Sequence, residues 1–200
     1  VEDVSFQVEA GETIGIIGPT GSGKSTLMDL VPRFYDATSG QVKIDGTDVR
    51  EIDPGRLRRA IAVVPQKALL FSGNILENLR WGDERALEED VKKAACIACA
   101  DEFVSAFPNG YETDLSQGGV NLSGGQKQRL SIARALVRKP RILILDDCTS
   151  ALDANTEARV LQGIRQETAD MTVLRISQRI STVMRSDRIR LLEDGRVKGL

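Results

Sequence analysis

The feature that most limits what this 200-residue chain can fold into is a glycine-rich segment near its start. The segment reads Gly18-Pro19-Thr20-Gly21-Ser22-Gly23-Lys24-Ser25 and fits the pattern GxxxxGK(S/T). The apolar run Thr13–Ile17 before it predicts a buried strand, and the residues from Ser25 to Val31 predict a helix that ends near Pro32. Because glycine-rich turns at helix N-termini direct backbone N–H groups at phosphate oxygens, we expect a phosphate-binding loop in an α/β fold.

Two side chains at the end of this loop add specific chemistry. Lys24 is expected to reach the β- and γ-phosphates of a nucleotide, and Ser25 to offer its hydroxyl to Mg²⁺. A capping turn without a ligand is the alternative, but it would not require this lysine and serine in register.

The strand patterns lie towards both ends of the chain, whereas the middle has helical spacing. Strands are predicted at Val4–Val8, Val42–Ile44, Ile61–Val64, Ile142–Leu145 and Val173–Ile176, with hairpin turns at Asp45-Gly46 and Asp194-Gly195. Between Leu69 and Ala135 the apolar residues follow a helical period. The sequence therefore predicts an α/β core, residues 1–68 and 136–200, that carries an inserted helical subdomain, residues 69–135.

Composition narrows the classes of function. Lys+Arg 27 against Asp+Glu 29 gives a net charge of -2, so we expect no nucleic-acid partner. No apolar run approaches the roughly 18 residues of a membrane span, and the chain itself is expected to be soluble. The three cysteines, Cys96, Cys99 and Cys148, are interpreted as small core residues rather than zinc ligands, and there is no histidine.

The apolar strand Ile142–Leu145 ends in two acids, Asp146 and Asp147. A plain core strand would explain the apolar residues but not the acidic pair at its end. With a phosphate loop already present, we interpret Asp146 as a ligand of Mg²⁺.

A second glycine-rich motif, Leu122-Ser123-Gly124-Gly125-Gln126, precedes a helical pattern. Ser123 and Gln126 have the spacing of a capping box, which is one interpretation of the motif. Capping does not require two bare glycines, however, and these can also expose backbone donors to an anion.

Taken in order, these motifs and the segment Ser150-Ala151-Leu152-Asp153 make the chain resemble ATP-binding-cassette (ABC) ATPases over essentially its whole length. The resemblance implies a P-loop NTPase fold, with a RecA-like core, an antiparallel β subdomain and an inserted α-helical subdomain. Gln66, after Val63-Val64-Pro65, matches the family's Q-loop glutamine. The segments Phe71–Ile75 and Asn109–Tyr111 look like the exporter branch, in which two such domains enclose two ATP molecules.

The resemblance implies ATP and Mg²⁺ as cofactors and assigns a set of site residues. ATP contacts are assigned to Gly18, Pro19, Thr20, Gly21, Ser22, Gly23, Lys24, Ser25, Thr26, Gln66 and Asp146, and Mg²⁺ contacts to Ser25, Gln66 and Asp146. Catalytic roles are assigned to Lys24, Gln66, Asp147 and Gln178. The signature motif Leu122, Ser123, Gly124, Gly125 and Gln126 would bind the partner's ATP, and Ser150, Ala151, Leu152 and Asp153 would form the D-loop at the dimer interface. Asp153 could also be the N-cap of the helix that follows it.

At two positions the sequence departs from the family pattern. Asp147 replaces the family's catalytic glutamate, and Gln178 replaces its switch histidine in Ile176-Ser177-Gln178-Arg179. The missing methylene shortens the reach of the acid by about 1.5 Å, and a displacement of about 1 Å can cost on the order of a hundredfold in rate. Glutamine cannot carry a proton, although it can still hydrogen-bond the γ-phosphate. Two unrelated, tolerated substitutions are the alternative interpretation.

We therefore expect the degenerate half of a heterodimeric exporter: a weak ATPase at its own site whose signature motif completes the partner's site. Its partners would be a second, non-identical ABC domain and a transmembrane domain outside this chain, at the cytoplasmic face of a membrane. The chain resembles an ABC domain, residues 1–200, trimmed at both ends. The alternatives are a non-hydrolysing regulatory ATP-binding module, a soluble ABC protein acting on ribosomes or DNA, and a homodimeric exporter with two weakened sites.

Overall fold

The computed structural model of the chain describes residues 1–167 and 170–198. Its internal contacts divide the chain into two compact units. The sheet unit comprises Val1–Val63, Pro140–Asp147 and Asp170–Leu200, and the helical unit comprises Val64–Lys139 and Cys148–Ala169. The segment Cys148–Ala169 therefore groups with the helices, whereas the sequence analysis assigned it to the α/β core.

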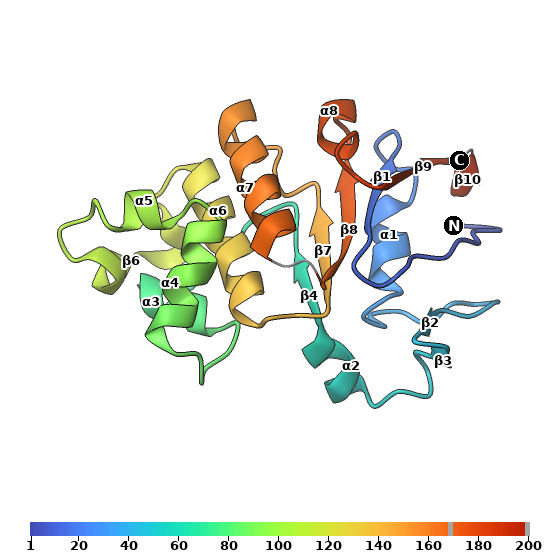
Figure 1. The fold of residues 1–200 in the computed structure, drawn as a ribbon, viewed down its shortest axis with the longest axis horizontal. Coiled ribbons are helices and arrows are strands. Elements are labelled where there is room, and N and C mark those ends of the chain that lie inside the picture. The colour runs from blue at the N-terminus through green and yellow to red at the C-terminus, as the bar shows by residue number, and fades with distance from the viewer. Residues whose placement is uncertain (168–169, 199–200) are drawn as a thin grey trace. The chain divides into compact units, whose positions relative to one another are not determined.

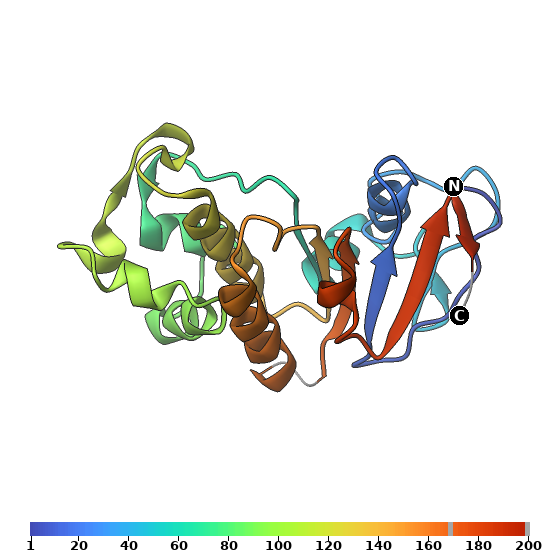
Figure 2. The same ribbon diagram turned by 90° about the horizontal axis from the view of Figure 1, so that it is seen from above.

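The sheet unit is built on a six-stranded sheet with the order β10-β9-β1-β8-β7-β4. Its strands are β1 (Thr13–Ile17), β4 (Ile61–Val64), β7 (Ile142–Asp146), β8 (Thr172–Ser177), β9 (Arg188–Glu193) and β10 (Arg196–Lys198). β1 pairs in parallel with both β8 and β9, β7 pairs in parallel with β8, and β10 is antiparallel to β9. Figures 1 and 2 show the blue strand β1 between β8 and β9. This parallel sheet confirms the predicted α/β fold class.

Apolar side chains bury the central strands of this sheet. Ile14, Ile16 and Ile144 are almost fully buried in one cluster with Leu174 and Ile176. Because parallel strands are covered on both faces, near-continuous apolar runs are expected in them. Three short helices belong to the same unit: α1 (Lys24–Asp29), α2 (Pro54–Ala60) and α8 (Ile180–Val183).

Both predicted hairpin turns are present. β2 (Lys43–Ile44) pairs antiparallel with β3 (Thr47–Asp48) across Asp45-Gly46, and β9 turns into β10 at Asp194-Gly195. Both central residues of each turn have positive φ, 50° and 79° in the first and 49° and 73° in the second. This is the backbone that tight two-residue hairpins require, and Asp-Gly adopts it readily.

The predicted strand at residues 4–8 is wrong. These residues show the expected alternation, because Val4, Phe6 and Val8 are half-buried against the core while their neighbours are exposed. The described residues nevertheless supply no ladder partner for this segment, and it is not a strand. Alternating burial alone therefore did not establish strand pairing.

Helices make up most of the second unit. They are α3 (Ile75–Arg80), α4 (Glu88–Ile97), α5 (Asp101–Val104), α6 (Gly124–Val137) and α7 (Ala154–Glu167), with 3-10 turns at Gly110–Glu112 and Gln117–Gly119. α6 packs against α3 and α4. One short antiparallel pair, β5 (Gly73–Asn74) with β6 (Asp114–Leu115), was not expected from the sequence. No helix in the described part of the chain is long and apolar enough to cross a bilayer.

Candidate nucleotide site

The glycine-rich loop leaves the end of β1 and leads directly into α1. A side chain at Gly18 would place its Cβ only 2.0 Å from the backbone oxygen of Leu192 on β9, so only glycine fits there. Gly21 and Gly23 have φ values of 80° and 94°, which side chains disfavour. The glycines are therefore required by the tight path of the backbone after the strand.

Lys24, the first residue of α1, folds back over this loop. Its side chain is buried, with Nζ donating to the carbonyl oxygens of Gly18 and Pro19 at 2.9 and 2.7 Å and to Ser22 Oγ at 3.3 Å. Burial lowers the pKa of Lys24, although Asp147 and Asp146 act in the opposite direction. A buried ammonium that is held by neutral oxygens is stabilised when an anion binds next to it. The loop is therefore suited to bind a phosphate group.

Asp146 ends β7 beside the phosphate loop. Burial raises its pKa and the Asp147 charge adds to this, whereas a hydrogen bond from Ser25 and the charge of Lys24 act against the rise. The structure thus brings Ser25 and Asp146 together, as the sequence analysis expected. A hydroxyl and a carboxylate are oxygen ligands that suit Mg²⁺, which also takes ligands from substrate phosphates. Within residues 1–167 and 170–198, no group of three or more His, Cys, Asp or Glu could hold a metal.

Asp147 and Gln178 lie in contact at the end of the neighbouring strands. Asp147 has a positive φ of 45° and is buried. Gln178 Nε2 donates to Asp147 Oδ2 at 3.3 Å, and Thr20 Oγ1 of the phosphate loop donates to Gln178 Oε1 at 3.3 Å. Ser177 Oγ is 3.5 Å from Asp147 Oδ1. We call the chain of contacts from Thr20 through Gln178 to Asp147 the Gln178 bridge.

The signature motif forms the start of α6 in the helical unit. Ser123 Oγ accepts from the backbone N–H of Gln126 at 3.2 Å, and the N–H of Ser123 donates to Gln126 Oε1 at 2.9 Å. The predicted capping box is therefore confirmed. Gly124 and Gly125 lie at the same helix start, where a Cβ on Gly125 would be 3.2 Å from the carbonyl oxygen of Ala151.

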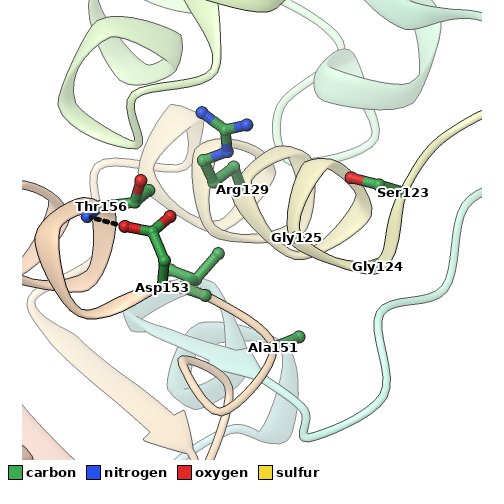
Figure 3. Close-up of a pocket in the computed structure, with 8 residues that line it drawn as sticks. Ser123, Gly124, Gly125, Arg129, Ala151, Asp153 and Thr156 are labelled. Atoms are coloured by element: carbon green, nitrogen blue, oxygen red, sulfur yellow. Dashed lines mark hydrogen bonds between the residues drawn. The ribbon is translucent and has the colours of Figure 1, made fainter.

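A pocket of about 440 Å³ opens between this helix start and the D-loop, within the same unit. Figure 3 shows its residues: Ser123, Gly124, Gly125, Arg129, Ala151, Leu152, Asp153 and Thr156. Asp153 caps α7 by accepting from the backbone N–H groups of Thr156 and Asn155 at 2.9 and 3.1 Å. The N-cap interpretation of Asp153 is thus confirmed, and its interface role stays a prediction.

Three polar residues near the pocket of the helical unit were not predicted from the sequence. Thr149 Oγ1 donates to Glu157 Oε1 at 2.5 Å, and both residues are buried beneath the D-loop. Arg129 donates to the carbonyl oxygen of Cys99 at 2.8 Å, which fixes its stem at the wall of the pocket. Thr149 adjoins Ser150 in the sequence, so its position was the available signal; nothing in the pattern singled out the other two.

Gln66 is exposed and follows β4 and Pro65. It belongs to the helical unit, so its contact with a nucleotide on the phosphate loop stays a prediction. Of the cysteines, Cys99 and Cys148 are buried as expected, but Cys96 is exposed. The pKa of Cys96 is raised by partial burial of its thiol and by the nearby Asp101, and the pKa of Cys99 is raised by burial, as expected for thiols without a catalytic role.

The parallel sheet has a phosphate loop after one strand and an acid at the end of another, and the helical unit carries a glycine-rich helix start. Together these features define an ABC-type nucleotide-binding domain of the P-loop NTPase fold. A model of the family described as ABC transporter matches residues 1–150. The chain belongs to this family.

Individual relatives agree with this assignment. The chain is 54% identical over 195 residues to the ABC transporter ATP-binding protein YfiB of Bacillus subtilis, covering 98% of this chain and 34% of YfiB. It is 44% identical over 197 residues to a putative multidrug export ATP-binding/permease protein of Staphylococcus aureus, covering 98% of this chain and 34% of that protein.

A solved structure is similarly close. A bacterial Atm1-family ABC exporter with ATP bound superposes with a TM-score of 0.95 and 41% identity, covering 98% of this chain and 35% of that one. The chain thus spans about a third of the length of the proteins it matches, and it is homologous to ATP-binding domains of exporter-type ABC proteins.

Proposed function

We propose that this domain binds MgATP at its own phosphate loop with little hydrolysis and completes a hydrolytic site on a non-identical partner. The observation that carries the proposal is the Gln178 bridge. It occupies the position where an ABC ATPase would hold a glutamate and a histidine, and the amide of Gln178 cannot carry a proton as a histidine does.

Binding is supported by the chemistry of the loop. Lys24, already buried beside the loop carbonyls, would exchange these neutral acceptors for β- and γ-phosphate oxygens, and backbone N–H groups of residues 20–26 would complete the cradle. When bound, Mg²⁺ would neutralise phosphate charge. Ser25 and Asp146 would hold it, with Gln66 as a further ligand, and the ion would relieve the repulsion between Asp146 and Asp147.

Slow hydrolysis is supported by the environment of Asp147. Its side chain is one methylene shorter than that of glutamate, and both of its carboxylate oxygens have side-chain neighbours, Gln178 and Ser177. A water-positioning acid must reach the attacking water, and a shortfall of about 1 Å can cost on the order of a hundredfold in rate. Gln178 can hold the γ-phosphate by hydrogen bonds, so binding would survive better than turnover.

The helical unit would act on the partner's nucleotide. Leu122–Gln126 and Ser150–Asp153 line or adjoin one pocket, with the bare backbone of Gly124 and Gly125 at its edge. These donors would bind the γ-phosphate of ATP held by the partner's phosphate loop, and the D-loop would contact that site across the interface.

The remaining partner is a transmembrane domain. The relatives are about three times longer than the matched part, and one is named as an ATP-binding/permease protein. We propose that this domain works at the cytoplasmic face of a membrane, attached through such a domain, and that ATP-driven closure with its partner powers export.

The deciding experiment compares two single substitutions in the assembled transporter. Asp147→Asn is expected to leave single-turnover ATP hydrolysis almost unchanged, because little hydrolysis occurs at this site. The matched asparagine substitution at the corresponding acid of the partner is expected to remove nearly all activity. A large loss with Asp147→Asn would contradict the proposal, and so would full activity of this chain without a second, different chain.

A further inference from the structure

Arg175 is a charged residue in the interior of the sheet unit. It lies in the middle of β8 between Leu174 and Ile176, and only 4% of it is exposed. A guanidinium cannot be deprotonated in a protein, so its burial costs free energy unless specific hydrogen bonds compensate. Its place in an otherwise apolar strand therefore calls for an explanation from its contacts.

The strand register shows what covers Arg175. Its partners on the adjacent strands are Gly15 of β1 and Leu145 of β7, so these three positions lie on the same face of the sheet. A Cβ on Gly15 would lie 2.8 Å from Val183 Cβ and 2.9 Å from Ser186 Oγ. The helix α8 and the turn after it therefore lie directly on this face, and α8 contacts both β1 and β8.

Arg175 binds the backbone of that helix. Its Nη1 donates to the carbonyl oxygen of Thr182 at 3.0 Å in a buried hydrogen bond. The last carbonyls of a helix have no partner within the helix, and a cation at this end is favourable. The guanidinium thus ties the end of a single helical turn to the centre of the sheet.

The segment held in this way begins one residue after Gln178. Arg179 is the N-cap of α8, and its backbone N–H donates to Ser177 Oγ at 3.0 Å. Residues 177–182 are therefore anchored at one end by β8 and at the other by Arg175. Gln178, which is exposed, projects from this short loop to Thr20 and Asp147.

We infer that Arg175 is a positioning residue for Gln178. By holding α8 on the sheet it fixes the backbone from which Gln178 reaches the γ-phosphate of ATP. This inference rests on the contact with the γ-phosphate proposed for Gln178. It assigns no contact between Arg175 and the nucleotide itself.

The test measures how strongly the site prefers ATP to ADP, because only ATP has the phosphate that Gln178 would contact. In the assembled full-length transporter, 8-azido-ATP is photocrosslinked to this chain and competed with ATP or ADP. Gln178→Ala and Arg175→Met are each expected to lower the preference about tenfold, the effect of losing one hydrogen bond to a charged group. The double variant is expected to fall no further than either single variant, and Arg175→Lys is expected to restore part of the preference.

Two controls separate positioning from a general loss of stability. The exposed residue Arg141 receives the same change, Arg141→Met, and is expected to keep the full preference. Met is apolar and of similar length, so it should suit the buried position and preserve the unfolding midpoint. Should Arg175→Met fail to fold, hydrogen exchange of residues 178–184 in Arg175→Lys is expected to exceed that of the wild type, with residues 13–17 unchanged.

The outcomes distinguish this inference from the proposed function. If Gln178→Ala lowers the preference but a folded Arg175→Met does not, or if the two effects add fully, Arg175 does not position Gln178 and the proposed function stands. Unchanged hydrogen exchange of residues 178–184 in Arg175→Lys would likewise show that Arg175 does not position Gln178. If Gln178→Ala itself has no effect, the proposed role of Gln178 fails and this inference fails with it.

Discussion

The carboxylate of Asp146, proposed above as a ligand of Mg²⁺, has a cost to folding. Its pKa is raised mainly by burial and also by Asp147, so the charged carboxylate destabilises the nucleotide-free fold. The cost grows as the pH rises through the folded pKa and disappears below the unfolded pKa of about 3.9, where both states are protonated. Asp146→Asn is therefore expected to raise the thermal midpoint at pH 7.5, with a difference that narrows towards pH 4.

The same variant is expected to lose the Mg²⁺ dependence of ATP binding. Calorimetric melts across pH, with the exposed Glu84→Gln as the matched removal of a carboxylate, would check the stability effect. A lower midpoint for Asp146→Asn at pH 7.5 would speak against burial as the main influence on this carboxyl.

The two departures at the site offer a gain-of-function measurement. Asp147→Glu combined with Gln178→His would restore the reach of the acid and supply a group that titrates near neutral pH. Hydrolysis at this chain's own site is expected to rise on the order of tenfold to a hundredfold, measured with the partner's corresponding acid neutralised. Gln178→His alone is the control and is expected to give a smaller rise. No gain in the double variant would mean that the weakness of the site lies elsewhere.

At the scale of elements, α6 depends on its cap. Ser123→Ala removes the hydrogen bond to the N–H of Gln126 and is expected to cost about 1 kcal/mol, or roughly 2–4 °C in the midpoint for a domain of this size. The partner's ATP hydrolysis is expected to fall more than this loss predicts, because Ser123 also lines the pocket. Asn74→Ala removes the capping box of α3, away from the pocket, and is the matched control. Equal effects of the two variants on hydrolysis would show that Ser123 acts only by capping α6.

Local patterns predicted some elements well and others poorly. The Asp-Gly turns, the capping box at Ser123 and the apolar strands β1, β7 and β8 depend on neighbours in the sequence, so the pattern sufficed. The segment at residues 4–8 failed because a strand needs a partner that the pattern does not reveal. Arg175 is another such case, since its role depends on Thr182 and on the close packing of α8 over Gly15. Long-range pairing is what a local reading omits.

For the molecule as a whole, nucleotide binding is expected to raise the free energy of unfolding. At a hundredfold excess over Kd a ligand adds about 2.7 kcal/mol, which for this size is a rise of roughly 5–10 °C in the midpoint. MgATP is expected to produce such a rise, Lys24→Ala to remove most of it, and EDTA to reduce it. Differential scanning fluorimetry of the full-length chain checks all three. An undiminished rise in Lys24→Ala would show that ATP binds away from the glycine-rich loop.

The amide of Gln178, linking Thr20 to Asp147, has a consequence for how the domain would respond to its surroundings. A histidine at this position would gain or lose its charge as the pH varies near neutrality, so the affinity for nucleotide would change with pH. An amide is indifferent to such swings, and the chain has no imidazole elsewhere to report them. The amide of Gln178 would therefore keep the same charge across the pH range in which a histidine titrates.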